Sequence, residues 1–521
     1  MATPSEKLAE SLRFLKEAQD RGQVVFQSTD LPRSDRERLV ATGFLSNVVK
    51  GWYIVSRPGE NEGDSTSWYA SFFDFVSAYC TARFSDAWYL SPELSIRLHA
   101  GETTIPRQIT VCTKDGSNNN LSLKFETSLF DLRVKDADFA AKDDIVVRQG
   151  LRLLSLPAAL VRATPTLYTT MPVEMRIALS GIRDVSDVLG KLLEGGHSVV
   201  AGRIAGAMRA IDRPEDADAI VKTMRSAGYV VNESNPFQDA VALSPLVFHD
   251  CPCVNRIRLM WQAMRETVLQ SFPPPPGVPA NLNSYIADLN DRHVQDAYHS
   301  LSIEGYRVSE ALIEKIVSGN WNPTGNDHDE KDRNALAAKG YNQAFQRVRE
   351  SVIAILKSGN AGEVVRRDHR DWYAQLFEPS VRAGIIEARH LAGYRTTAVF
   401  IKNSRHVPPA QESVRDAMPA LFELLKEEKE ASVRAVLGHF VFVYIHPYMD
   451  GNGRMGRFLM NAMLASGGYP WTVIKVDDRG KYMTALEEAS TKGDIGPFAD
   501  FIGQCVTRQM DAISTAQMVK K

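Results

Sequence analysis

The sequence has few of the features that mark secreted, membrane-embedded or nucleic-acid-coating proteins. Its 521 residues include only five cysteines, at scattered positions, which does not suit a disulfide framework. No stretch approaches the roughly twenty apolar residues that cross a bilayer, and the opening MATPSEKLAE has no apolar signal segment. A formal net charge of −2 gives no general attraction to nucleic acid or anionic membrane. We therefore expect reduced thiols, no membrane contact and a cytoplasmic location.

The composition is that of a folded chain with several domains. Apolar residues make up 44% and charged residues 24% of the sequence, as in soluble globular proteins. The length favours about three domains. Four successive prolines, Pro273–Pro276, favour an extended spacer, which we interpret as a linker rather than an SH3-type ligand. The expected parts are 1–60, 61–250, a helix with the proline-rich linker at 251–280, 281–510, and a tail at 511–521.

The most informative stretch is His446–Arg457, His-Pro-Tyr-Met-Asp-Gly-Asn-Gly-Arg-Met-Gly-Arg, which lies between two apolar runs. The flanking patterns predict helices, and Pro447 with two glycines predicts a tight loop between them. Amide groups of such a loop, at a helix N-terminus, can bind phosphate oxygens. The alternative is a polar helix–loop–helix turn without chemistry, but so many specified residue types in twelve positions favour a site.

The residue types in this loop suit phosphoryl-type transfer. His446 is a candidate general base for an attacking hydroxyl. Asp450 is an oxygen ligand suited to Mg²⁺. Arg454 and Arg457, three apart on the second helix, can face one anion.

The stretch resembles the signature of the Fic family, with Tyr448 in place of the usual phenylalanine. The resemblance implies an all-helical domain that transfers AMP from ATP to a Ser, Thr or Tyr hydroxyl of a target protein and releases pyrophosphate. It implies that His446 deprotonates the target and that Asp450 holds Mg²⁺. The residues that it assigns to the nucleotide are Asp450, Gly451, Asn452, Gly453, Arg454, Met455, Gly456 and Arg457.

A second stretch, Ser300–Gly305, resembles the inhibitory motif of the same family, within a helix predicted over 283–305. Ser300 and Glu304 share one helix face, and Gly305 can end the helix in a left-handed conformation. The resemblance places Glu304 against Arg457, where the γ-phosphate of ATP would dock. Glu304 could instead position water that removes AMP from a modified target, and the sequence leaves both roles open.

Two further predictions concern the surroundings of the loop. The stretch from Gly393 through Ile401 to Val407 predicts a β-hairpin, which resembles the Fic flap that docks the target. Ile401 is the candidate flap residue for nucleotide contact. Tyr482, on a predicted helix, is a candidate for stacking on the base.

The N-terminal half carries weaker signals. Residues 1–60 resemble the winged helix-turn-helix of abortive-infection-type antitoxins, with Arg33, Arg36 and Arg38 on or beside the recognition helix. The balance of charge there is small, so DNA contact and protein docking both stay open. Residues 61–250 predict a mixed α/β domain, with strands at 108–112 and 121–125 and a helix at 151–161.

The combined expectation is a mainly α protein whose Fic domain follows a winged helix-turn-helix and a mixed α/β domain. We predict a Mg²⁺-dependent protein adenylyltransferase, inhibited by Glu304. The alternatives are AMP removal, transfer of UMP or GMP, and a DNA-binding regulator of toxin–antitoxin type whose Fic domain senses nucleotide. The partners are ATP and an unidentified target protein, and a homodimer is also considered.

Overall fold

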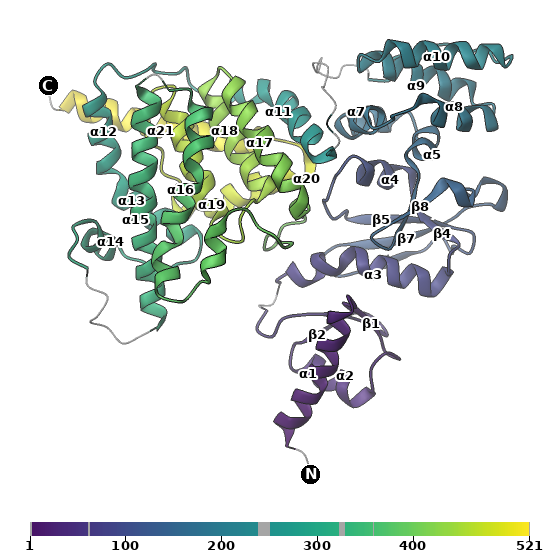
Figure 1. Cartoon of the computed structure of the whole chain (residues 1–521), viewed down its shortest axis with the longest axis horizontal. Helices are drawn as coiled ribbons and strands as arrows, with labels where there is room; N and C mark the ends of the chain where they lie inside the picture. The colour runs from purple at the N-terminus through teal and green to yellow at the C-terminus, as the bar shows by residue number, and fades with distance from the viewer. Residues whose placement is uncertain are drawn as a thin grey trace. The chain divides into compact units, whose positions relative to one another are not determined.

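The computed structural model describes residues 3–60, 63–237, 249, 251–321, 329–357 and 359–519. The fold is mainly α, and the chain forms two compact units. The first unit comprises Met1–Pro252 with Phe400–Val407, and the second comprises Cys253–Val399 with Pro408–Lys521 (Figure 1). Within the described ranges, no helix combines the length and the apolar character needed to cross a bilayer.

The first unit begins with two helices and a small antiparallel sheet in the order β1-β3-β2. Leu15, Phe26 and Leu39 bring helix, strand and helix together in one buried cluster. Amphipathic helices of this length need such a shared core to be stable. The elements are α1 (Pro4–Asp20), β1 (Val25–Gln27), α2 (Arg33–Ala41), β2 (Leu45–Val49) and β3 (Trp52–Val55).

The three arginines considered for DNA contact have partners inside this unit. Arg33 pairs with Glu37 at 2.7 Å. The guanidinium of Arg36 donates to the carbonyl of Ser28. Arg38 donates to Ser11 Oγ at 2.6 Å. These contacts reduce the number of guanidinium donors that are available to phosphates.

A four-stranded sheet follows, in the order β4-β5-β7-β6, with α3 lying along it (Figure 1). The two strands predicted at 108–112 and 121–125 do not pair with each other: β5 pairs in parallel with β7, and β6 pairs antiparallel with the other side of β7. The side chain of Asp131, on β7, accepts from Asn119 N at 2.7 Å and so fixes the turn between β5 and β6. The elements are α3 (Thr66–Phe84), β4 (Trp88–Leu90), α4 (Pro92–His99), β5 (Gln108–Thr113), β6 (Asn120–Ser122) and β7 (Ser128–Arg133).

The rest of the first unit is a hairpin followed by helices. The predicted helix at 151–161 is wrong in its first part, because Leu151–Leu154 forms a strand and the helix begins after Ser155, whose hydroxyl caps it. The elements are β8 (Ile145–Arg148), β9 (Leu151–Leu154), α5 (Leu156–Val161), α6 (Leu167–Thr170), α7 (Pro172–Ser180), α8 (Val185–Glu194), α9 (Ser198–Ala210) and α10 (Pro214–Ser226).

The predicted flap hairpin is not a pair of strands. Residues 393–407, all described, contain a short turn, in which Ser404 N donates to Ile401 O at 3.1 Å, but no strand. Instead of pairing within a hairpin, Arg405 exchanges hydrogen bonds with Ile105 in the first unit: Ile105 N donates to Arg405 O at 2.8 Å, and Arg405 Nη1 donates to Ile105 O at 3.1 Å. This pairing explains why Phe400–Val407 groups with the first unit.

The second unit is helical. The sequence pattern predicts one helix over 283–305, but the structure has two, separated at Arg292. The elements are α11 (Pro252–Ser271), α12 (Leu282–Asp291), α13 (His293–Ile303), α14 (Glu310–Val317), α15 (Asp329–Leu356), α16 (Ala361–Arg382), α17 (Gln411–Glu427), α18 (Ala431–Ile445), α19 (Asn452–Ala465), α20 (Arg479–Lys492) and α21 (Gly496–Val519).

The proline-rich stretch lies inside the second unit, between α11 and α12. Tyr469 OH donates to Pro273 O at 2.7 Å, and Gly277 N donates to Gly467 O at 3.0 Å. These bonds hold the stretch against the turn that follows α19.

Helices α18 and α19 form the centre of the second unit (Figure 1). All residues of α18 are buried except Arg434 and Val443, and all residues of α19 are buried except Gly453. A helix that is apolar around its whole circumference has to be surrounded by others. The polar residues of His446–Arg457 therefore gather where these two central helices meet.

We expect Gly340→Ala to destabilise the second unit, because a Cβ at this position of α15 would lie 2.1 Å from the carbonyl oxygen of Leu376 on α16. Overpacking of this kind costs about 1–3 kcal/mol. Scanning calorimetry should show a lower melting temperature. Gly480→Ala is the matched control, since nothing lies within 4 Å of that Cβ. Equal melting temperatures for the two variants would contradict the close packing of α15 on α16.

Candidate active site

The loop between α18 and α19 is held by two residues with positive φ. His446 ends α18 with φ 51°, and Gly451 precedes α19 with φ 80°. Glycine is required at the second position, because a Cβ there would lie 2.8 Å from the ring of Phe377. Arg395 holds the loop from outside, with its amide donating to Pro447 O and its Nε to His446 O, both at 2.8 Å.

His446 is arranged to accept a proton. Its Nδ1 lies 3.2 Å from the carbonyl oxygen of Val443, so Nδ1 carries the hydrogen and Nε2 keeps its lone pair. Burial lowers the pKa of His446 to about 4, with a further small decrease from Arg395. The imidazole is therefore neutral near pH 7, which is the form that a general base needs.

The N-terminus of α19 offers free backbone donors. The first bond within this helix runs from Met455 N to Gly451 O at 2.9 Å, so the amides of residues 452–454 precede it. Gly451, which the resemblance assigns to the nucleotide, has no free amide, because its N donates to Asp450 Oδ1 at 2.6 Å. The available donors are therefore those of 452–454, at the positive end of the helix dipole.

Arg454 is a buried cation without a full set of partners. Its guanidinium lies over the rings of Tyr306, at 5.2 Å, and Phe377, at 5.0 Å. Nε and Nη2 are buried and make no hydrogen bond, although Nη2 lies 3.5 Å from Asp450 Oδ2. Buried donors in folded proteins normally have acceptors. This guanidinium therefore suits an anion that arrives at the N-terminus of α19.

Arg457 already has an anion. Its Nη2 donates to Glu304 Oε1 at 2.7 Å, and its Nε donates to Ser300 Oγ at 2.9 Å. Burial tends to raise the pKa of Glu304, but the charges of Arg457 and Arg454 outweigh it and the pKa is lowered. In turn, Glu304 outweighs the effect of burial on Arg457 and raises the pKa of that guanidinium. Both groups are charged, and the pair joins α13 to α19.

Glycine at 453 makes room for this carboxylate. A Cβ at Gly453 would lie 2.3 Å from Glu304 Oε1. Gly305, with φ 88°, ends α13, and Tyr306 N donates back to Leu301 O at 3.1 Å. The helix end thereby directs Glu304 toward the first turn of α19.

Four residues that were predicted to contact the nucleotide have the following surroundings in the structure. The side chain of Asn452 bonds both backbone groups of Tyr448, at 2.9 and 2.8 Å, and so holds the loop. Met455 is 1% exposed and lies in the core. Gly456 packs against His439. Ile401 belongs to the segment that groups with the first unit.

Tyr482, the candidate for stacking on the base, lies in the core. It is 1% exposed, its hydroxyl lies 2.9 Å from His439 Nε2, and its ring contacts Phe498 and Phe501. Its α20 helix presents this position to the core, so the ring has no open face for a base. Burial raises the pKa of its hydroxyl.

Three structural contributors were missed in the sequence. Arg395 was considered only as part of the flap, although it donates to the carbonyl of His446. The ring of Tyr373 stacks on Tyr448 with centroids 3.7 Å apart. Asp296 accepts from Tyr341 OH at 2.7 Å, close to Arg457. No local pattern distinguishes these residues from ordinary helix positions.

One carboxylate in the loop suits a metal ion. Asp450 is exposed and oriented by the Gly451 amide, and Mg²⁺ usually takes one or two carboxylates together with substrate phosphates. Among the described residues, no cluster of three His, Cys, Asp or Glu side chains could hold a metal without such a substrate. Asp450 therefore fits a metal that binds together with a polyphosphate.

Residues 364–464, which contain the loop and its arginines, match the sequence model described as "Fic/DOC family" and form a Fic domain. Among curated proteins, the chain is similar to "Protein adenylyltransferase Fic" of Nematostella vectensis, with 31% identity over 231 residues, 43% of this chain and 49% of that protein. The protein of the same name from Drosophila willistoni is 28% identical over 225 residues, 42% of this chain and 41% of that one. The chain thus spans about half or less of these relatives. The solved structure of "Fic-1 (aa134 - 508) from C. elegans" matches 67% of this chain and 89% of that one, with 16% identity and a TM-score of 0.39.

We expect Tyr448→Phe to stabilise the protein, because the hydroxyl of Tyr448 is buried and has no hydrogen-bond partner. An unsatisfied buried group costs about 1–3 kcal/mol. The same change at Tyr341 should destabilise, since it removes the hydroxyl that donates to buried Asp296 at 2.7 Å. Denaturant unfolding measures both, and a loss of stability in Tyr448→Phe would contradict this account of its hydroxyl.

Proposed function

We propose that the second unit transfers AMP from ATP to a Ser, Thr or Tyr hydroxyl of a target protein, with release of pyrophosphate. The observation that supports this most is the buried Arg454 guanidinium, whose Nε and Nη2 make no hydrogen bond, at the same helix end as the free amides of 452–454. The name of the curated relatives supports the choice of AMP. The relatives are only partly covered, so the activity is an inference for this chain.

In the proposed reaction, the target hydroxyl oxygen attacks the α-phosphorus while its proton passes to His446 Nε2. The bond between the α-phosphorus and the bridging oxygen breaks, and its electron pair leaves with pyrophosphate. The amides of 452–454 and Arg454 stabilise the charge on the phosphates. Asp450 would hold Mg²⁺, which supplies further neutralisation of phosphate charge when bound.

We further propose that the structure represents an inhibited state. The carboxylate of Glu304 takes the guanidinium that a γ-phosphate would otherwise use, at 2.7 Å from Arg457 Nη2. ATP that cannot reach Arg457 would bind with its α-phosphate out of line for attack. The same anionic carboxylate could orient water toward an AMP-modified hydroxyl, so removal of AMP is the second candidate function.

We assign the first unit to docking of a protein partner rather than DNA, since Arg33, Arg36 and Arg38 already have internal partners. We also propose a cytoplasmic location, with which the small number of cysteines in the sequence, five in 521 residues, agrees.

We expect Glu304→Gly to raise AMP transfer by about a hundredfold, the scale on which misplacement of a reacting group acts. Incubation with Mg²⁺ and ATP labelled in the α-phosphate would show labelled protein, and Glu304→Gly with His446→Ala should show none. Glu304→Gln tests charge alone, because it keeps the size of the side chain and weakens the bond to Arg457. Equal labelling of Glu304→Gly and the double variant would remove His446 as the base. Labelled wild type with unlabelled Glu304→Gly would contradict inhibition.

The pH dependence of the Glu304→Gly variant tests the state of His446. The base must be unprotonated, and its pKa is lowered to about 4. The value of kcat/KM should therefore stay flat between about pH 6 and about pH 8, whereas an ordinary histidine would lose activity as the pH falls through about 6.5. A decrease centred near that ordinary value would contradict the buried, neutral imidazole.

A further inference from the structure

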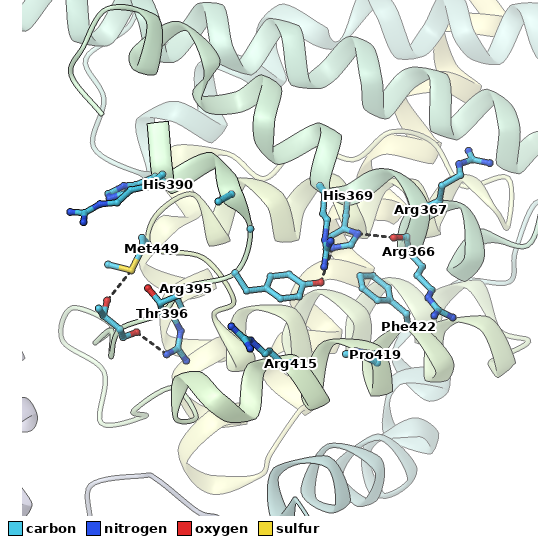
Figure 2. A pocket seen from close by; sticks show the side chains of 16 residues that line it. Arg366, Arg367, His369, His390, Arg395, Thr396, Arg415, Pro419, Phe422 and Met449 are labelled. Atoms are coloured by element: carbon cyan, nitrogen blue, oxygen red, sulfur yellow. Dashed lines mark hydrogen bonds between the residues drawn. The ribbon is translucent and has the colours of Figure 1, made fainter. Parts of the chain in front are cut away.

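The second unit contains a cavity of about 1000 Å³ beside the loop between α18 and α19. Its walls come from α16, the segment 389–397, α17 and Met449. Figure 2 shows Arg366, Arg367 and His369 toward one end and His390, Thr396 and Met449 toward the other. Nothing in the proposed reaction uses this cavity.

The cavity is lined by cations, and half of its arginines have no carboxylate or carbonyl partner among the described residues. Its described lining includes six arginines and no aspartate or glutamate. Three of the arginines are engaged: Arg395 with backbone carbonyls, Arg367 with Asp368 and Arg389 with Glu387. The other three are exposed and form no ion pair with any described carboxylate: Arg366, Arg370 and Arg415.

Part of this cationic surface is held in place. The guanidinium of Arg370 lies 5.3 Å from the centre of the Tyr394 ring. The hydroxyl of Tyr394 is 2.8 Å from His369 Nε2, and Nδ1 of that buried histidine bonds carbonyls of its own helix. Arg366 lies one turn before Arg370 and shares its helix face. Two guanidiniums are therefore set on a packed helix, which lowers the entropic cost of binding an anion.

The cavity borders the loop that carries His446. Thr397 Oγ1 lies 3.2 Å from Met449 Sδ, and Met449 directly precedes Asp450. Arg395, which lines the cavity, donates to the carbonyls of Pro447 and His446. A chain segment that presents a hydroxyl at this loop can therefore reach the cavity with residues close to it in sequence.

We propose that the cavity binds an acidic segment of the target protein, a short run of Asp and Glu side chains near the hydroxyl that receives AMP. This inference rests on the proposed function and names its substrate class. The open shape and the exposed guanidiniums suit several separate carboxylates. The cavity has no array of backbone amides like that of α19, which a compact polyphosphate would use. Charge complementarity of this kind selects partners and speeds encounter.

The test measures binding without catalysis. A fluorescein-labelled peptide with one serine followed by four glutamates, and a matched peptide with four glutamines, would be titrated with the full chain by fluorescence anisotropy. We expect the acidic peptide to bind at least about tenfold more tightly at low salt, with the preference falling as salt rises. The preference for the acidic peptide should be abolished in the triple variant Arg366→Ala, Arg370→Ala and Arg415→Ala. The control is the triple variant Arg347→Ala, Arg382→Ala and Arg508→Ala. It removes the same charge from exposed positions outside the cavity and should leave the preference for the acidic peptide unchanged.

Several outcomes would overturn the proposal. These are equal affinity for the two peptides, a preference that survives the cavity variant, and a preference lost equally in the control variant. Inorganic triphosphate that binds more tightly than the acidic peptide, and only with the cavity arginines present, would assign the cavity to a small polyanion instead. Failure of the proposed function shows separately, as absent labelling of Glu304→Gly, because both anisotropy and labelling are measured on each variant.

Discussion

The second unit depends on the ion pair between Arg457 and Glu304. A guanidinium that is 3% exposed has lost most of its hydration, so it needs an anion close by. Ser300 and Glu304, from α13, satisfy it in this structure. In the proposed function a γ-phosphate would take the place of the carboxylate, so the two anions would compete for one cation. The position of α13 on α19 is in this way linked to the anion that Arg457 binds, because loss of the carboxylate without a replacement leaves a buried charge unpaired.

The surrounding helices explain why the chemistry is concentrated at one loop. Since α18 and α19 are buried on all sides, polar groups can reach solvent only where the two helices meet. This constraint places His446 at the end of one helix and the free amides of 452–454 at the beginning of the other. It also sets the protonation state of His446, because the apolar surroundings that end at this loop lower its pKa. The burial of these two helices therefore determines both where the polar residues gather and the protonation state of His446.

Features that depend on residues close together in the sequence could be predicted, and features that depend on distant residues could not. The loop and the left-handed Gly305 depend on proline, glycine and neighbouring residues, so a local pattern predicts them. The burial of Tyr482 was not predicted, because helical spacing does not say which face meets the core. The flap hairpin was wrong, and the parallel pairing of β5 with β7 was not predicted, because the partners are not the neighbouring segments in the sequence. Arg395 was missed for the same reason, since its acceptors are about fifty residues distant.

The arginines of the second unit divide into two classes that suit two tasks. Arg454 and Arg457 are buried and held by aromatic rings or a carboxylate, so they can meet a phosphate with little reorganisation. Arg366 and Arg415 are exposed on long side chains, which suits carboxylates whose positions vary from one partner to another. The proposed reaction needs both properties, because its nucleotide would be constant while its protein substrate would not. Separate cations allow the affinity for the target to change without disturbing the geometry of phosphate transfer.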